Sequence, residues 1–167
     1  MNIINVYTDG STLNIQNKGS RRGGIGVFFG DNIAYNKSIP LIESDTNRVT
    51  NQVAELQACI TAIEIAIEES LLLDNILNIC TDSMYTINSI TIWCKKWKNN
   101  NWKKSNGKII ENLEYISKLY EYYLQYNIKF THVRAHMTKP PHPVLYMHWY
   151  GNMMADKLAT DASKTIL

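Results

Sequence analysis

Cysteine is scarce in this chain, and the three that occur, Cys59, Cys80 and Cys94, have no CxxC or CxxxC spacing. An odd number of cysteines without such spacing argues against both a disulfide framework and a zinc site. We therefore expect reduced thiols. This indicates a protein that works inside the cell in a reducing compartment, either cytoplasmic or nuclear, or in the host cell if the source is viral.

Long apolar runs and an N-terminal leader are also missing. No apolar stretch is long enough to span a bilayer, and residues 1–5 have neither the basic nor the apolar part of a signal peptide, so we expect no membrane partner. The 167 residues fit one domain, and their apolar fraction of 45% is ordinary for a globular protein. A first predicted strand directly after Met1 favours a free-standing chain over a piece of a polyprotein.

Positive charge is in small excess, with a net charge of +2, and the positive residues are unevenly distributed. Six lysines fall between residues 95 and 108, and they are interleaved with tryptophans that begin at Trp93. Lysines can pair with phosphates and tryptophans can stack on sugars or bases, so this basic segment favours nucleic-acid binding. The alternative is a solvated helix face with tryptophans in the core.

The hydrophobic pattern predicts strands followed by alternating helices and strands. Short β-prone runs end at turn signals, whereas apolar residues at spacings of three and four indicate helices. The predicted strands cover 3–8, 24–29, 33–39, 76–81 and 128–133, with a polar hairpin loop at 14–23; the predicted helices cover 51–73, a segment from 84, 109–126 and 152–163. This order is typical of an α/β fold with a mixed sheet and helices on its faces.

Four carboxylates are candidates for a common site. Asp9 and Asp82 each follow a predicted strand, and ligand sites in open α/β sheets form beyond the carboxyl ends of strands. If these strands are parallel neighbours, Glu55 and Asp156 on the following helices can reach the same rim. Taken singly, Asp9 is explained as a turn residue and the two helix carboxylates as solvated residues. Asp82 is explained as a cap of the helix from Met84, which Ser83 could cap instead.

Convergence of these carboxylates points to a metal site. Close carboxylates repel one another, and divalent cations such as Mg²⁺ relieve the repulsion. Two such ions about 4 Å apart can activate water and stabilise the leaving oxygen in phosphodiester hydrolysis. His136, in the loop before Asp156, is explained as an exposed loop residue, but beside a metal site it could carry protons or assist product release.

In combination, these residues resemble type 1 ribonuclease H, and its eukaryotic form in particular. The resemblance covers nearly the whole chain, and each matching segment is specific only in combination with the others. The segments that carry it are Tyr7-Thr8-Asp9-Gly10-Ser11, Gly24-Ile25-Gly26-Val27, Thr50-Asn51-Gln52, Ala54-Glu55, Thr81-Asp82-Ser83-Met84, Ile90-Thr91, Trp93, Trp97-Lys98, Trp102-Lys103, His132-Val133, His136, Gly151-Asn152 and Ala155-Asp156.

The resemblance implies an endonuclease that hydrolyses the RNA strand of RNA–DNA hybrids. The implied fold is a five-stranded mixed sheet in the order 3-2-1-4-5, with the first three strands antiparallel and helices on its flanks, forming a monomeric catalytic domain over residues 1–167. Two Mg²⁺ ions, or Mn²⁺, would be held by Asp9, Glu55, Asp82 and Asp156, with Asp9 bridging both ions. His136 would be a mobile histidine that assists turnover.

The resemblance also implies three groups of substrate contacts. One group would lie in the minor groove, where 2′-hydroxyls distinguish RNA from DNA. A second would form a pocket for a phosphate of the DNA strand, and a third a channel for deoxyriboses. The groups are, in that order, Asn51, Gln52 and Met84; Arg48, Thr50 and Asn112; and Trp93, Trp97 and Ser105.

Three features differ from relatives of this family. The loop 137–150 is long and contains three prolines, and we expect it to fold over the substrate cleft and modulate product release. Val53 stands where relatives often have arginine, and we expect no separate N-terminal hybrid-binding module of the kind that many eukaryotic members have.

Two other functions stay open. One is a non-catalytic hybrid-binding module, which the presence of all four carboxylates disfavours. The other is a different nuclease or strand-transfer enzyme of the same fold, such as a junction resolvase or an integrase. The basic segment and the Thr50-Asn51-Gln52 run favour the hybrid nuclease.

Overall fold

One five-stranded sheet, in the order β3-β2-β1-β4-β5, organises the computed structural model, which describes residues 1–13 and 21–165. Its strands are β1 (Asn2–Leu13), β2 (Arg22–Phe28), β3 (Lys37–Ile42), β4 (Asn75–Thr81) and β5 (Ile128–His132). β1, β2 and β3 pair antiparallel, and β4 runs parallel to β1 and β5. The predicted α/β class, strand order and antiparallel start are confirmed. Most of the predicted hairpin loop, residues 14–20, lies outside the described residues.

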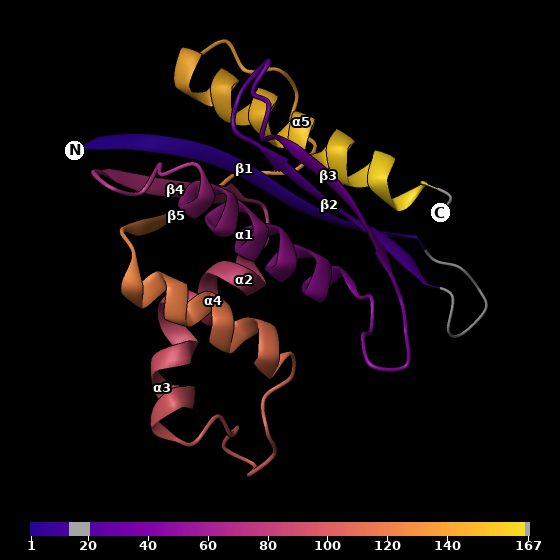
Figure 1. Ribbon diagram of the computed structural model, residues 1–167, viewed down its shortest axis with the longest axis vertical. Helices are drawn as coiled ribbons and strands as arrows, with labels where there is room; N and C mark the ends of the chain where they lie inside the picture. The colour runs from indigo at the N-terminus through magenta and orange to yellow at the C-terminus, as the bar shows by residue number, and fades with distance from the viewer. Residues whose placement is uncertain (14–20, 166–167) are drawn as a thin grey trace.

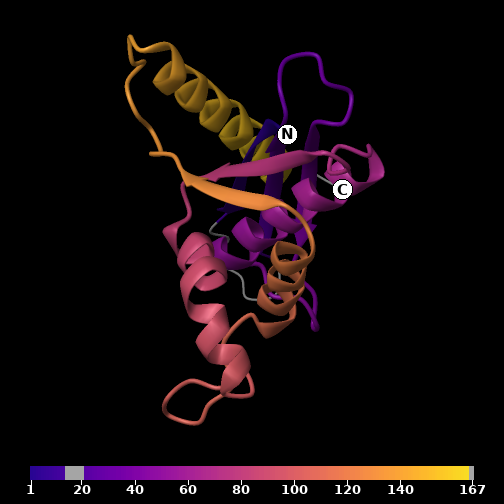
Figure 2. The same ribbon diagram turned by 90° about the vertical axis from the view of Figure 1, so that its left-hand side faces the viewer.

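Helices cover both faces of the sheet (Figures 1 and 2). α5 (Pro143–Ser163) packs on one face, over β1, β2 and β3, while α1 (Asn51–Glu68) packs on the opposite face and α4 (Leu113–Gln125) packs against α1. After β4 the chain forms α2 (Met84–Asn88), a π-helical segment (Ser89–Trp93) and α3 (Cys94–Asn99). Figure 2 shows α3 projecting away from the sheet. No helix within the described residues is long and apolar enough to cross a membrane.

The two-residue alternation of the strands divides the core between these layers. Val6 and Ile79, which are register partners, belong to the large core cluster under α1 and α4. Their neighbours Tyr7 and Cys80, also register partners, belong to the smaller cluster that includes Ala155 of α5. Both faces of β1 and β4 are therefore buried, which explains why these strands read as nearly continuous apolar runs.

The predicted position of β3 was wrong, because Pro40 was assigned to a loop. Pro40 lies within β3 and is the register partner of Gly24. β3 is an edge strand, so the proline nitrogen, which cannot donate a hydrogen bond, is tolerated there.

The predicted start of the last helix was also wrong by nine residues, since α5 begins at Pro143 and not at residue 152. His142 caps the helix, with its Nδ1 accepting the Val144 N–H at 3.3 Å, and proline is favoured in a first helical turn. The first turns of α5 have exposed apolar side chains, including Leu145 and Met147, so no single buried stripe marks them as helical. Much of the predicted loop 137–150 is therefore helix.

Candidate active site

The Asp9-Gly10 turn signal predicted Asp9 at the end of its strand. In the structure Asp9 lies inside β1. Its partner in the antiparallel pair is Gly26, whereas the parallel pairing of β1 with β4 stops at Tyr7 and Cys80. β1 therefore runs past the end of β4 and continues in the pairing with β2. Asp9 lies just beyond the level at which β4 ends, and it is only 5% exposed.

Glu55 is placed next to β1 by a close approach of α1. A Cβ atom on Gly10 would lie 2.5 Å from the backbone nitrogen of Glu55, so a larger residue would push the helix away. α1 begins just before this contact, where the Thr50 hydroxyl accepts the Val53 N–H at 3.1 Å. Glu55 is 9% exposed and therefore points into the molecule and not, as a solvated helix residue would, into water.

Asp82 follows β4 directly and does not cap the next helix. The cap of α2 is Ser83, whose hydroxyl accepts the Thr86 N–H at 3.2 Å. Thr81 in turn accepts the Ser83 N–H at 3.1 Å, which fixes the turn. The explanation of Asp82 as a helix cap is therefore wrong, and its carboxylate accepts no capping hydrogen bond from α2.

Asp156 comes to the same place from the opposite face of the sheet. A Cβ on Gly26 would overlap the carbonyl oxygen of Ala155, so glycine is what lets α5 lie so close to β2. Gly26 is also the sheet partner of Asp9. This single contact therefore brings Asp156, the residue after Ala155, towards Asp9.

The four carboxylates converge. Asp9, Glu55 and Asp82 each have a carboxylate oxygen within 4.8 Å of the others. Asp156 lines the same hollow, which has a volume of about 300 Å³. Since the carboxylates come from β1, from the residue after β4 and from two helices on opposite faces, their convergence depends on the packing of α1 and α5 described above.

The electrostatics of this carboxylate cluster are those of a cation site. Burial raises the pKa of Asp9 and repulsion from Glu55 and Asp82 raises it further, while burial and then Asp156 raise the pKa of Asp82. Burial also raises the pKa of Glu55. Within the described residues, the buried Oε2 of Glu55 has no hydrogen-bond partner. Hard carboxylate oxygens that repel one another, one of them buried without a donor, fit Mg²⁺ or Mn²⁺, which prefer oxygen ligands.

His136 lies at the rim of the carboxylate cluster. It lines the hollow that contains all four carboxylates and a neighbouring hollow of about 220 Å³ that contains Asp82 and Asp156. The side chain is exposed, and its backbone φ of 53° lies in the left-handed region. The imidazole can therefore reach a group bound at the carboxylates without being fixed by them.

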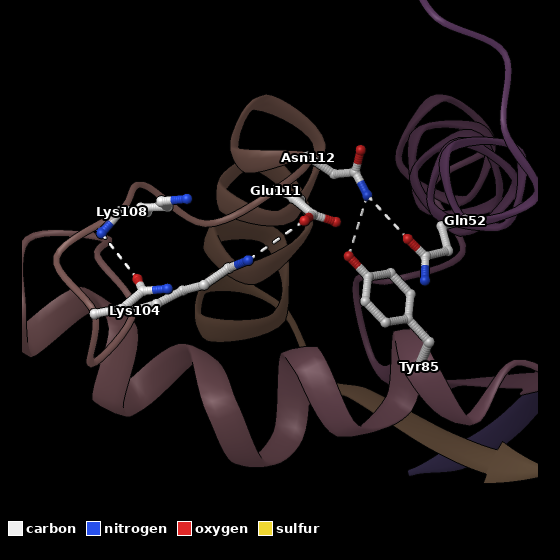
Figure 3. A network of polar contacts seen from close by, with 7 residues as sticks. Gln52, Tyr85, Lys104, Lys108, Glu111 and Asn112 are labelled. Carbon is white, nitrogen blue, oxygen red and sulfur yellow. Dashed lines mark hydrogen bonds and ion pairs between the residues drawn. The ribbon is translucent and has the colours of Figure 1, made fainter.

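Gln52 and Asn112 meet across the gap between α1 and α4 (Figure 3). The Asn112 Nδ2 donates to Tyr85 Oη at 3.1 Å and to Gln52 Oε1 at 3.5 Å. A hydrogen bond thus connects Gln52, which belongs to the expected minor-groove group, with Asn112, which belongs to the expected phosphate pocket. Of the other pocket residues, Thr50 caps α1 and Arg48 is exposed in the preceding loop.

The remaining minor-groove residues lie at the open side of the carboxylate cluster. Asn51 and Gln52 line the hollow of the carboxylates, and Asn51 Oδ1 accepts a hydrogen bond from the Thr12 hydroxyl at 2.6 Å. Met84, at the start of α2, is 44% exposed. Met84 directly follows Ser83, which lines the hollow, so its exposed apolar side chain is available to a ligand.

The tryptophans of the basic segment divide between surface and core. Trp93 is 38% exposed and lies 5.7 Å from Trp97, ring centre to ring centre, while Trp97 and Trp102 pack partly against the core. Ser105 is exposed in the loop after α3. Trp93 is therefore the tryptophan most accessible to a substrate, and the alternative of core tryptophans holds for the other two.

Sequence reasoning missed several residues that shape the site. Tyr85 stands next to Met84 but had no signal of its own, because its partner Asn112 is distant in the sequence. Asn152 was noted only as part of a matching segment, yet its buried Oδ1 has no hydrogen-bond partner within the described residues and the side chain lines the hollow beside Asp156. Trp149 was assigned to a loop.

Comparisons with known proteins agree with this geometry. The RNase H family model matches residues 1–164. The chain is 38% identical over 154 residues to the ribonuclease H of Schizosaccharomyces pombe, covering 92% of this chain and 50% of that protein. It is 32% identical to the ribonuclease H of Ruthia magnifica, covering 99% of both chains. The solution structure of the PFV RNase H domain superposes with a TM-score of 0.68 at 26% identity, covering 95% of this chain and 93% of that domain.

The eukaryotic relatives are longer proteins. This chain spans about half the length of the ribonuclease H of Schizosaccharomyces pombe, and it covers 49% of the human protein named ribonuclease H1.

Proposed function

The chain belongs to the RNase H family, and from this premise we propose that it is a metal-dependent endonuclease that hydrolyses the RNA strand of an RNA–DNA hybrid. One observation carries the proposal. Asp9, Glu55 and Asp82 present carboxylate oxygens within 4.8 Å of one another, and none of the three forms an ion pair within residues 1–13 and 21–165. Burying such a cluster costs stability, and a metal-binding function explains why the chain keeps it.

We propose that Asp9, Glu55, Asp82 and Asp156 together hold two Mg²⁺ ions, or Mn²⁺, with Asp9 shared between them. When bound, these ions supply Lewis acidity, which makes water a better nucleophile and stabilises charge at the phosphate. The unpartnered Oε2 of Glu55 and the raised pKa values of Asp9 and Asp82 support this assignment. The open side of the hollow leaves room for a phosphate at the carboxylates.

His136 would act on protons at the same place. Its imidazole lies at the rim, next to Asp82 and Asp156, and can carry a proton to or from an oxygen of the phosphate held there. We propose that this step assists departure of the cleaved strand. The exposed position of His136 supports the assignment, because a side chain that is not packed can move during turnover.

We propose that the hybrid lies across this rim. Asn51, Gln52 and Met84 would contact the minor groove. Asn51 and Gln52 line the carboxylate hollow, and Met84 is exposed directly after Ser83, which also lines it, and these positions support the assignment. The expected phosphate pocket consists of Arg48, Thr50 and Asn112, and the expected deoxyribose channel consists of Trp93, Trp97 and Ser105. The exposed face of Trp93 and the neighbouring lysines support a DNA-strand contact by the projecting α3 region.

The remaining proposals concern the whole molecule. We propose that residues 1–167 act as one catalytic domain and as a monomer. We further propose a reducing compartment, which the absence of any disulfide among Cys59, Cys80 and Cys94 supports.

A cleavage assay tests the function. An RNA–DNA hybrid, a double-stranded RNA and a double-stranded DNA of one sequence are incubated with the protein in Mg²⁺ and in EDTA. We expect metal-dependent cutting of the RNA strand in the hybrid alone. Asp9→Asn should abolish cutting while leaving hybrid binding largely intact, whereas Asp45→Asn, a matched change at an exposed loop position, should change neither.

Each other outcome has a defined meaning. Cleavage retained in Asp9→Asn would contradict the proposed site. Binding of the hybrid without any metal-dependent product would indicate a non-catalytic binding module. Preferential cutting of double-stranded DNA would indicate a junction resolvase, an integrase or another nuclease of this fold.

A further inference from the structure

The loop that carries His136 is tied to α5 by one side chain. The indole N–H of Trp149 donates a hydrogen bond to the carbonyl oxygen of Met137 at 2.8 Å. In the part of the chain that the structure describes, this is the only hydrogen bond that joins residues 134–141 to another element. Because Met137 directly follows His136, the bond holds the Met137–Thr138 peptide group, one residue after the imidazole.

Aromatic contacts reinforce this attachment. The Trp149 ring lies 5.5 Å from the ring of Tyr146, centre to centre, and the Lys139 ammonium lies 5.4 Å from the centre of the Tyr146 ring. A cation over an aromatic face is attracted to it. The loop is thus held to α5 at Met137 and at Lys139, and Trp149 takes part in the first contact and supports the second.

The backbone of His136 needs such support. Its φ of 53° lies in the left-handed region, which is disfavoured for a residue with a Cβ atom and persists only where the surroundings impose it. The loop is otherwise exposed, and its sequence has no glycine. Without the bond from Trp149, we expect the loop to sample other conformations in which the imidazole points elsewhere.

The position of Trp149 in α5 makes this support specific. Trp149 precedes Asp156 by seven residues, which is about two turns, so the two side chains lie on the same helix face. Trp149, His136 and Asp156 line one hollow together with Asp82. One rigid helix therefore places a carboxylate of the cluster directly and places His136 through the bond to Met137.

We propose that Trp149 is a positioning residue, whose indole N–H holds the His136 loop in the conformation used during turnover. The inference rests on the proposed function and on the role of His136 in it. The inference differs from our expectation that the loop 137–150 folds over the substrate cleft. α5 takes up most of that segment, and the side chain of Trp149 in α5 holds the remaining loop at Met137.

The test uses Trp149→Phe, which keeps an aromatic ring but removes the donor. We expect kcat for hybrid cleavage to fall about three- to tenfold, the range for one neutral hydrogen bond, with KM nearly unchanged. In the background of His136→Ala the same substitution should have no further effect on kcat, because the group that it positions is gone. Tyr150→Phe is the matched control, since it removes the bond from the adjacent helix residue to Asp31 (2.6 Å), away from the loop.

A second measurement does not depend on activity. Arg134 is the only residue of 134–141 after which trypsin can cut, because Lys139 precedes Pro140. Limited digestion at Arg134 should be faster in Trp149→Phe than in the parent chain or in Tyr150→Phe, with circular dichroism confirming that all three are folded.

The outcomes separate the inference from the proposed function. If His136→Ala impairs cleavage while Trp149→Phe leaves both kcat and digestion unchanged, the positioning role is wrong. An equal loss from Trp149→Phe with and without His136 would show that Trp149 acts in another way, which also overturns the inference. If His136→Ala cleaves like the parent chain, the role of His136 fails first, and if the parent chain does not cleave at all, the proposed function fails.

Discussion

Replacing Asp9 by asparagine should stabilise the protein when no divalent metal is present. The carboxylate of Asp9 is 5% exposed and faces Glu55 and Asp82 across at most 4.8 Å. Asparagine has nearly the same shape but no charge, so the substitution removes repulsion without creating a cavity. A residue that serves metal binding is expected to cost stability in the metal-free protein.

The magnitude follows from Coulomb's law. Two unit charges about 4 Å apart interact by about 4 kcal/mol at an effective dielectric constant of about 20. Part of that repulsion is already relieved, because the raised pKa of Asp9 means that the folded protein binds a proton there more readily than the unfolded chain. We therefore expect a gain of about 2 kcal/mol near pH 8, which corresponds to a rise in Tm of roughly 4–8 °C for a domain of this size.

The pH dependence has a definite sign. A carboxyl group whose pKa is raised on folding destabilises the folded state increasingly as the pH rises above the pKa of that group in the unfolded chain, here 3.8. The stability difference between Asp9→Asn and the parent chain should therefore be small near pH 4 and grow towards neutral pH. Mg²⁺ should reverse the order, since it stabilises the parent chain more than the variant.

Urea unfolding in EDTA at pH 5 and pH 8, followed by a Mg²⁺ titration, measures these effects. Asp45→Asn is the control, because it removes an equal charge from an exposed position. Equal or lower stability of Asp9→Asn in EDTA at pH 8 would refute the reasoning, since it would mean that the carboxylates do not repel one another in the folded protein.

Three further substitutions test the packing and the substrate contacts. Gly26→Ala should destabilise the protein by about 1–3 kcal/mol and reduce cleavage, because its Cβ would overlap the Ala155 carbonyl oxygen; an unchanged urea midpoint would contradict this. Tyr85→Phe removes the hydroxyl that accepts a hydrogen bond from Asn112, and it should raise KM about two- to fivefold with kcat unchanged. Steady-state kinetics that give the parent KM would exclude a role of Tyr85 in positioning Asn112 for substrate binding. Trp93→Ala should weaken hybrid binding about fivefold or more, measured by fluorescence anisotropy, while the salt dependence stays the same because no charge is lost; unaltered affinity would remove Trp93 from the interface.

The chemistry of the site could be read from residue types. The sequence singled out Asp9, Glu55, Asp82 and Asp156 as candidates, because carboxylates are the ligands that Mg²⁺ prefers and because two of them follow apolar runs typical of a buried sheet. The strand order came from the resemblance and the layers came from the hydrophobic pattern. The layers are set by burial of one element against another, and burial leaves a regular hydrophobic pattern in the sequence.

Other features were decided by contacts between segments far apart in the sequence. Whether Asp82 or Ser83 caps α2 depended on which side chain turns towards the Thr86 N–H, and both residue types are good caps. The start of α5 could not be predicted because its first turns bury no continuous apolar stripe. The hydrogen bond from Trp149 to Met137 forms only because that helix begins early enough to present the indole to the loop. Such choices differ by about one hydrogen bond in free energy, and only the packed structure determines which groups come within reach.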